Sequence, residues 1–483
     1  MTPEPGDQYI HPLTERYSSA EMQAVFAPTH RFGIWRRLWL ALAETQRELG
    51  LSIPDAAIEG MRQNLDAFDL QKAAEYEKTF RHDVMAHVHL FGDAVPVARG
   101  IIHLGATSAF IGDNTDLILH REALTLVRVR IVRTIRELAQ FARVNRAVPT
   151  LGYTHFQPAQ PTTIGKRATL WIQDLLLDVE ELDFRLETLR FRGAKGTTGT
   201  QASFLELCNG DHDKVTALDR SVAKRMGFVK SYGVTGQTYP RKVDAAIVGT
   251  LSGIGASLSK FGNDLRLLAH LREIEEPFEE TQIGSSAMPY KRNPMRAERI
   301  CSLARHVITL SMDPSMTAAS QWLERTLDDS ANRRLSIPDA FLTLDGALVL
   351  AENVSSGLVV HAAVVRRHLD RDLPFIAMES VLMRAVERGG GDRQDLHERI
   401  RRHAFAATEK IKAGGENDLI RRIAEDEAFA LSAESLHEML EAQSFVGRAP
   451  EQVDGFLEES VDPLLARLGP QADQLVGAPD VRV

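Results

Sequence analysis

The segment 284–294, GSSAMPYKRNP, combines small residues with side chains able to do chemistry. It carries two hydroxyls (Ser285 and Ser286), an ammonium group (Lys291) and an amide (Asn293), and its two prolines keep a helix from running through it. The pattern predicts a mobile loop that binds a carboxylate through Lys291 and Asn293. A serine without a basic partner is a poor base, so the residues alone leave a second interpretation open, a polar connection between helices.

Two further stretches contain polar groups next to breaks in the helical pattern. In 151–163, LGYTHFQPAQPTT, His155 lies between a glycine turn and a proline-rich run, which predicts a loop or a helix start. Imidazole titrates near neutral pH and suits a general acid, although a structural histidine is the alternative. In 103–116, HLGATSAFIGDNTD, Thr107 and Ser108 precede a predicted helix. They are either anion-binding groups at its N-terminus or simple caps.

Basic residues cluster locally although the chain carries a formal net charge of −9. That net charge disfavours a main role in non-specific nucleic-acid binding, which needs a broad basic surface. Local clusters on an acidic chain suit a small anionic substrate in a focused pocket, and surface ion pairing is the alternative. The clusters comprise Lys291, Arg292, Arg296 and Arg299, and then Arg325, Arg333 and Arg334.

Metal and phosphate-loop chemistry are both disfavoured by spacing. His82, His87 and His89 do not share one helical face, and the chain has no HExxH motif, so we expect no metal site. The glycine-rich run 192–204 lacks GK[ST] and a preceding strand, which argues against a P-loop.

The elements that must position these groups are helices, because apolar residues recur at steps of three and four. The stretch 243–276 predicts one helix of about 50 Å at 1.5 Å per residue, long enough for an elongated bundle. We find no alternation of strands and helices and predict an all-α fold. The two clearest stripes are Leu124, Val127, Ile131, Ile135, Leu138 and Ala142, and Ile247, Leu251, Ile254, Leu258, Phe261, Leu265 and Leu268.

Breaks in this pattern divide the chain of 483 residues into three predicted helical domains, 1–110, 111–365 and 366–483. The central domain is the long-helix bundle. The third begins near a DLP turn at 372–374 and contains shorter helices joined by glycine runs at 389–391 and 414–415. The end, 469–483, has no period and is expected to be loose.

Two cysteines outside any CxxC pair, Cys208 and Cys301, argue against a disulfide scaffold. No apolar run approaches the roughly 18 residues that a membrane span needs, and the N-terminus has no basic start followed by an apolar segment. We therefore expect a cytoplasmic protein.

The loop 284–294 resembles the signature loop of the fumarase/aspartase superfamily, and 151–163 and 103–116 resemble its two other signatures. The resemblance implies that Ser285 removes a proton next to a carboxylate, that Lys291 and Asn293 hold that carboxylate, and that His155 protonates the leaving nitrogen. Thr107 and Ser108 would bind a substrate carboxylate. The implied fold is all-α, with the central bundle forming the core of a homotetramer whose active sites each draw on three subunits.

Within the superfamily, the chain is most similar to the adenylosuccinate lyase family. This implies release of fumarate from adenylosuccinate, giving AMP, and from the succinyl-aminoimidazole-carboxamide ribotide (SAICAR), giving AICAR, with no metal or organic cofactor, nucleic acid or membrane partner. The rival interpretations are a sister lyase acting on argininosuccinate, malate or aspartate, and a non-catalytic helical scaffold. The nucleotide contacts implied by the resemblance are Arg16, Tyr17, Arg81, Asp83, Gln237, Arg299, Arg325, Ser330 and Arg334, with His82 supporting the acid.

Overall fold

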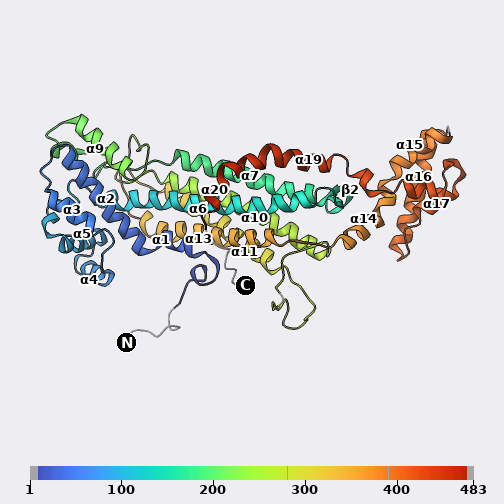
Figure 1. Cartoon of the computed structure of the whole chain (residues 1–483), viewed down its shortest axis with the longest axis horizontal. Coiled ribbons are helices and arrows are strands. Elements are labelled where there is room, and N and C mark those ends of the chain that lie inside the picture. The colour runs from blue at the N-terminus through green and yellow to red at the C-terminus, as the bar shows by residue number, and fades with distance from the viewer. Residues whose placement is uncertain (1–8, 280, 390, 476–483) are drawn as a thin grey trace.

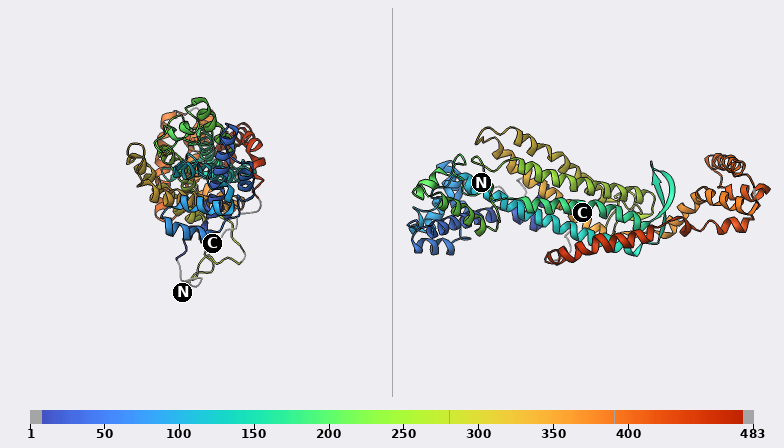
Figure 2. Two further views of the ribbon diagram at one scale, coloured as in Figure 1. Left: turned by 90° about the vertical axis from the view of Figure 1, so that its left-hand side faces the viewer. Right: turned by 90° about the horizontal axis from the view of Figure 1, so that it is seen from above.

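Long helices lie side by side along one axis and make the molecule an elongated rod in the computed structural model (Figures 1 and 2). The structure describes residues 9–279, 281–389 and 391–475. The central bundle consists of α6 (Ser108–Val144), α7 (Ile164–Thr188), α10 (Lys242–His270), α11 (Met295–Leu310) and α13 (Asp329–Ser356). In the described part of the chain, no helix is long and apolar enough to cross a membrane.

Both predicted apolar stripes lie in the core of this bundle, and every one of their residues is buried there. The helix predicted over 243–276 is shorter than expected. It ends at His270, because Arg272 takes a left-handed backbone conformation (φ 59°) and the chain continues into a short strand.

The N-terminal end of the rod is a cluster of shorter helices with its own hydrophobic core. This core also takes in Phe191, Val215 and Tyr239, which come much later in the sequence. The elements of this end are η1 (Leu13–Tyr17), α1 (Ala20–Phe26), α2 (Pro28–Glu48), α3 (Asp55–Gln63), α4 (Leu70–Phe80), α5 (Asp83–Ala94), η2 (Pro96–Ala98), α8 (Ala202–Leu207) and α9 (His212–Arg225).

At the opposite end, small helices form a separate core, and the last helices return along the bundle (Figure 1). The cores therefore combine segments from different parts of the chain, and the division at residues 110 and 365 stays a prediction. The elements of this end and of the returning segment are α14 (Ala362–Ile376), α15 (Met378–Gly389), α16 (Arg393–Lys412), α17 (Leu419–Glu425), η3 (Glu427–Phe429), α18 (Ala433–Glu438), η4 (Ala442–Phe445), α19 (Ala449–Phe456), η5 (Leu457–Val461) and α20 (Asp462–Ala472). A further helix, α12 (Met312–Ala319), packs instead against α10 and the start of α13.

Two local predictions at this end are wrong. The DLP sequence at 372–374 does not break the helix, because α14 continues through Pro374 to Ile376 while Leu369 and Leu373 anchor it in a small apolar core. Part of the end predicted to be loose is helical, since α20 runs to Ala472. Residues 476–483, and Gly390 in the predicted glycine joint, lie outside the described residues.

Short antiparallel strands complete the described fold. β1 (Pro149–Thr154) pairs with β2 (Gln157–Thr163), and β3 (Ile274–Glu275) pairs with β4 (Val359–Val360). The proline-rich run after His155 is thus a strand, and His155 lies in the turn before it, which confirms the predicted loop and not the helix start. A two-stranded hairpin has only edge strands, so prolines whose missing N–H faces outward cost no ladder hydrogen bond. This hairpin, drawn in teal, stands out from the bundle in Figure 2.

Candidate active site

A pocket of about 390 Å³ lies where the N-terminal helices meet the first turns of the bundle. Its walls come from the turn between α4 and α5, the N-terminus of α6, and the segment that leads into α13. These elements are far apart in sequence, yet they bring together seven of the predicted site residues. The seven are Arg81, His82, Asp83, Ser108, Arg325, Ser330 and Arg334.

The RHD sequence forms the joint between two helices. Arg81 ends α4 in a left-handed conformation (φ 54°), which is uncommon for a residue with a side chain and often marks a functional position. His82 then caps α5, its Nδ1 accepting from the Met85 N–H at 3.4 Å. Asp83 accepts from Arg334 Nη2 at 3.3 Å, which links this joint to α13. The motif thus presents a guanidinium, an imidazole and a carboxylate at one rim of the pocket.

The α6 N-terminus forms the neighbouring wall. Thr107 is its N-cap residue, but the Thr107 side chain makes no capping hydrogen bond, and Ser108 lines the pocket. The first backbone N–H groups of a helix lack partners within it and favour an anion there. The predicted helix start is confirmed, and the hydroxyls stand beside a site that is electrically suited to a carboxylate or phosphate.

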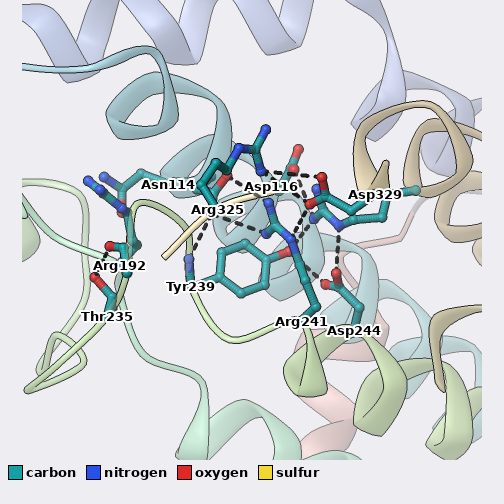
Figure 3. Close-up of polar contacts among 12 residues, drawn as sticks. Asn114, Asp116, Arg192, Thr235, Tyr239, Arg241, Asp244, Arg325 and Asp329 are labelled. Carbon is teal, nitrogen blue, oxygen red and sulfur yellow. Dashed lines mark hydrogen bonds and ion pairs between the residues drawn. The ribbon is translucent and has the colours of Figure 1, made fainter. Parts of the chain in front are cut away.

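A buried ion-pair network forms the floor of the pocket (Figure 3). Arg241 is 3% exposed and donates to both oxygens of Asp113 at 3.1 and 3.2 Å and to Asp329 at 2.5 Å. Arg325 reaches the same Asp329 carboxylate at 3.3 Å. Asp329 is fully buried, so its charge is tolerated only because these guanidinium groups pair with it.

The second half of the network is centred on Arg333. Its Nε donates to Asp244 at 2.6 Å, and its Nη2 donates to Asp116 at 3.0 Å and to the Tyr239 hydroxyl. The Tyr239 hydroxyl in turn donates to Asp244 at 2.6 Å. Arg31 also pairs with Asp116, at 3.0 Å.

The floor is electrically balanced. Four carboxylates (Asp113, Asp116, Asp244 and Asp329) face four guanidinium groups (Arg31, Arg241, Arg325 and Arg333). Positive charge free to meet a ligand is therefore left at the rim. There, Arg81 is exposed and forms no ion pair with a described residue, and Arg334, although it pairs with Asp83, is 68% exposed at its side chain.

Burial and ion pairing shift the pKa values of the floor groups. Burial opposes ionisation of Asp116, but the Arg333 and Arg31 guanidinium groups outweigh it and hold the pKa of that carboxyl well below its ordinary value. Burial lowers the pKa of His120, which keeps its imidazole neutral despite the nearby Asp244 and Asp116 carboxylates. The floor is thus a fixed scaffold of charges rather than a source of protons near neutral pH.

Most floor residues are absent from the candidates chosen from sequence. A signal was available for Asp244, which lies three residues before Ile247 and so falls on the apolar stripe of α10. Asp113 likewise follows the buried Phe110 by three residues on α6. A charged residue at a stripe position implies a buried partner, but the identity of that partner is not encoded locally.

His155 lies elsewhere, at the tip of the β1–β2 hairpin. Thr154 pairs with Gln157, and the two residues between them, His155 and Phe156, have φ values of 52° and 57°. Positive φ at both central positions is the type I′ geometry that usually requires glycine or asparagine. His155 is exposed there, so the strained turn holds the imidazole out into solvent.

The length of α6 separates His155 from the pocket within one chain. Ser108 begins α6 at the pocket, and the 37 residues of this helix end at Val144, shortly before β1. At 1.5 Å per residue the helix is about 55 Å long. Figure 1 shows β2 near the other end of the bundle from α4 and α5.

The loop 284–294 also starts at the far end of a long helix, since α10 separates it from Arg241 by 29 residues, or about 43 Å. Inside the loop, Asn293 Nδ2 donates to the Gly284 carbonyl at 2.8 Å, and Ser285 Oγ accepts from the Met288 N–H at 3.2 Å. Lys291 is exposed. The loop hangs below α11 in Figure 1, and none of its residues lines the pocket of the same chain.

The remaining predicted residues form two further groups. Arg299 lies over the Tyr17 ring at 5.5 Å, and Arg16, beside Tyr17, is exposed. Gln237 donates its backbone N–H to the Glu324 carbonyl at 2.9 Å and its side chain to the Thr197 carbonyl at 3.0 Å. Gln237 is thus held beside the segment that carries Arg325, although it does not itself line the pocket.

The three histidines considered as metal ligands point to different neighbours. His82 caps α5, His87 stacks on Phe32 at 3.9 Å, and His89 stacks on Phe80 at 4.4 Å. Among the described residues, no group of three or more His, Cys, Asp or Glu side chains is arranged to hold a metal ion.

Solved structures with similar folds cover nearly the whole chain. The crystal structure of 3-carboxy-cis,cis-muconate lactonizing enzyme from Pseudomonas putida has a TM-score of 0.79, covers 93% of this chain and 97% of its own, and is 23% identical. The crystal structure of fumarate lyase from Mesorhizobium has a TM-score of 0.78, covers 94% and 100%, and is also 23% identical. At these identities the likeness concerns the fold alone, and it confirms the predicted all-α architecture.

Sequence comparisons are more specific. A lyase family model matches residues 14–309, and a model of the adenylosuccinate lyase C-terminus matches residues 374–456. The adenylosuccinate lyase of Saccharomyces cerevisiae is 53% identical over 95% of this chain and 96% of its own length, and that of Schistosoma mansoni is 49% identical over the same shares. With matches of this identity along almost its full length, the chain belongs to the adenylosuccinate lyase family and is a lyase.

Proposed function

We propose that the chain splits adenylosuccinate into AMP and fumarate, and SAICAR into AICAR and fumarate, by β-elimination. The observation that carries this proposal is the pocket at the α6 N-terminus. It combines a charge-balanced floor with unpaired or exposed cations and hydroxyls at its rim, an arrangement that suits a phosphate-bearing substrate. Arg81, Arg334 and Ser330 are the groups we assign to the nucleotide part.

The chemical step needs a base, an acid and groups that stabilise the negative charge that develops on the substrate. In our proposal Ser285 takes the proton from the succinyl carbon next to the carboxylate, while Lys291 and Asn293 stabilise that carboxylate as it accepts the electron pair. The C–N bond then breaks, and His155 donates a proton to the leaving nitrogen. Thr107 and Ser108 hold the second carboxylate. Fixed donors of this kind stabilise charge that develops in the transition state.

The loop 284–294 is suited to close over a bound substrate. Arg296, 1% exposed, anchors its base by donating to the Pro277 carbonyl at 3.0 Å and to Glu279 at 2.6 Å. Beyond this anchor the side chain of Tyr290 in the loop is 83% exposed, and that of Ile283, just before the loop, is 75% exposed. A firmly held base with an exposed apolar tip is the pattern expected of a loop that excludes water when it closes.

We further propose that a complete active site is assembled from several subunits of a homotetramer. The lengths of α6 and α10 separate the pocket from His155 and from the start of the 284–294 loop by tens of ångströms within one chain. Neighbouring chains that pack along the bundle would supply these groups, and the family resemblance implies three chains per site.

The bundle surface supports such packing. On α7, Leu170, Leu177 and Phe184 follow one another at intervals of seven residues, and each side chain is about half exposed, at 50–52%. On α10, Gly249 and Gly253 have open space where a side chain would be. An exposed apolar stripe beside a helix face of small residues favours close helix packing against another copy.

Turnover by the purified protein tests the function. Wild type and the Ser285→Ala variant are incubated with adenylosuccinate and with SAICAR, and the products are separated by chromatography, with argininosuccinate, malate and aspartate as alternative substrates. We expect AMP, AICAR and fumarate from wild type, and collapse of both activities in Ser285→Ala. Turnover of argininosuccinate, malate or aspartate alone would replace the proposed substrate, and a confirmed tetramer that turns over none of them would refute the enzyme assignment.

Light scattering on wild type and Leu177→Glu tests the assembly. We expect a tetramer that dissociates in the variant, with loss of activity on dissociation. Fully active monomers would contradict the shared site.

We also propose a cytoplasmic location, which fits the free and buried Cys208 and Cys301. Cell fractionation tests this location.

A further inference from the structure

A second, larger pocket lies outside the candidate active site, between α9, the loop that follows it and the glycine-rich segment 193–201. Its volume is about 780 Å³, within the range of small-molecule pockets. None of the predicted site residues lines it. Its lining includes one carboxylate, Asp219, and four cationic side chains: Lys195, Arg220, Lys224 and Lys230.

The single carboxylate, Asp219, is already paired within the protein. Asp219 is buried, accepts from Lys195 Nζ at 2.8 Å through one oxygen, and accepts from the Ala194 N–H at 2.7 Å through the other. Lys195 and Asp219 thus neutralise each other. Arg220, Lys224 and Lys230 have no ion-pair partner among the described residues, so the pocket retains a charge of about +3 on an acidic chain.

Two of these cations repel each other. Thr216, Arg220 and Lys224 follow at intervals of four on α9, so they share one face, and like charges four residues apart destabilise a helix by about 0.2–0.5 kcal/mol. On the same helix Arg225, which does not line the pocket, is paired with Glu44 and Glu48. The α9 face toward the pocket therefore lacks the acidic partners that the other face has.

The opposite wall is held in place by backbone hydrogen bonds. Phe191 donates its N–H to the Lys230 carbonyl at 3.0 Å and accepts from the Tyr232 N–H at 2.8 Å, which fixes the loop that carries Lys230. Between them, Ser231 Oγ is a buried polar atom without a hydrogen-bond partner among the described residues. Phe228 and Tyr232 add aromatic surface to the same wall. The pocket is thus preformed, with Arg220 and Lys224 on one side and Lys230 on the other, beside polar and aromatic side chains.

We propose that this pocket binds a phosphate monoester of a small organic molecule, such as a sugar phosphate or a nucleoside monophosphate. Arg220, Lys224 and Lys230 would hold the phosphate, and the aromatic wall would pack against the organic part. The volume exceeds what a phosphate group alone fills, which favours the ester over the free ion. This is a second anion site, separate from the pocket at the α6 N-terminus.

The test compares two double variants of the full-length protein that each remove two positive charges from α9. Arg220→Ala/Lys224→Ala removes pocket cations, and Lys214→Ala/Arg225→Ala removes cations outside the pocket. Both are made in an Arg334→Ala background, which weakens phosphate binding at the candidate active site. Calorimetry then measures binding of inorganic phosphate and of ribose 5-phosphate, with circular dichroism to confirm that each variant is folded.

We expect the Arg334→Ala protein to bind ribose 5-phosphate more tightly than phosphate. The pocket variant should weaken ribose 5-phosphate binding by at least about tenfold, the effect of losing charge-assisted hydrogen bonds, and the control variant should leave it within about twofold. Equal loss in both double variants, no loss in the pocket variant, or no binding by the Arg334→Ala protein would each overturn the proposal. Equal affinity for the two ligands would overturn the assignment to an ester.

Discussion

Mixing two inactive variants tests whether His155 and the pocket of one chain serve different active sites. His82 lines the pocket together with Ser108, and about 55 Å of α6 separates Ser108 from the strand that leads to His155. Acid–base groups act within hydrogen-bond reach of the substrate, about 3 Å. The two histidines of one chain therefore cannot meet at one substrate, and a site that uses both takes them from different chains.

The expected magnitude follows from random assortment. When His155→Ala and His82→Asn chains are mixed in equal amounts, dissociated and reassembled, a site is intact only if one chain type supplies His82 and the other supplies His155. Each condition holds for half of the sites, so activity should recover to about one quarter of wild type. Asparagine is chosen at position 82 because it is itself a good N-cap residue and keeps the start of α5 capped.

The assay is release of AMP and fumarate, with a different affinity tag on each variant to isolate mixed assemblies. As a control, His155→Ala chains are mixed with chains that carry both substitutions, and no recovery is expected because no chain supplies His155. Isolated mixed assemblies that stay inactive would refute the reasoning, since both histidines would then have to come from one chain.

Three further predictions concern the loop, the floor and pH. Gly284→Ala would put a Cβ 2.2 Å from the Lys291 carbonyl oxygen, which would displace the loop. We therefore expect kcat to fall on the order of 100-fold, with little change in Tm. An unchanged kcat would speak against a role for loop geometry. Asp329→Ala leaves Arg241 buried without its second carboxylate partner. Urea unfolding should show that the free energy of unfolding falls on the order of 3–5 kcal/mol. A decrease below about 1 kcal/mol would contradict the account of the floor. Burial lowers the pKa of His87 to about 4, so the unfolded chain binds more protons below pH 6.5, and stability falls as the pH drops from 6.5 towards 4. His87→Phe should remove on the order of 2 kcal/mol of the stability loss between pH 7 and 4.5, and identical acid-unfolding curves would exclude this origin.

Helix prediction from sequence succeeded where a side-chain period reports burial directly. The stripe from Ile247 to Leu268 identified α10 because apolar residues at steps of three and four must face a core. It failed where tertiary contacts outweigh a local signal. Pro374 sits inside α14, which is anchored by Leu369 and Leu373. It also failed at the prolines after His155, which occupy a hairpin strand whose turn, His155 and Phe156, lacks the glycine or asparagine that signals such a turn.

The same distinction applies to the candidate site. Motifs in the sequence, through the family resemblance, predict the groups that do the chemistry, among them Ser285, His155 and the RHD run, because residue type determines what a side chain can donate, accept or protonate. Only the tertiary structure decided which groups share a pocket. Asp244 and Arg333 are paired by the packing of two helices that are distant in sequence, and the rigid length of α6 keeps His155 away from the pocket where its own chain places His82. Local sequence sets the chemistry of each side chain, whereas distances between side chains depend on how rigid helices pack.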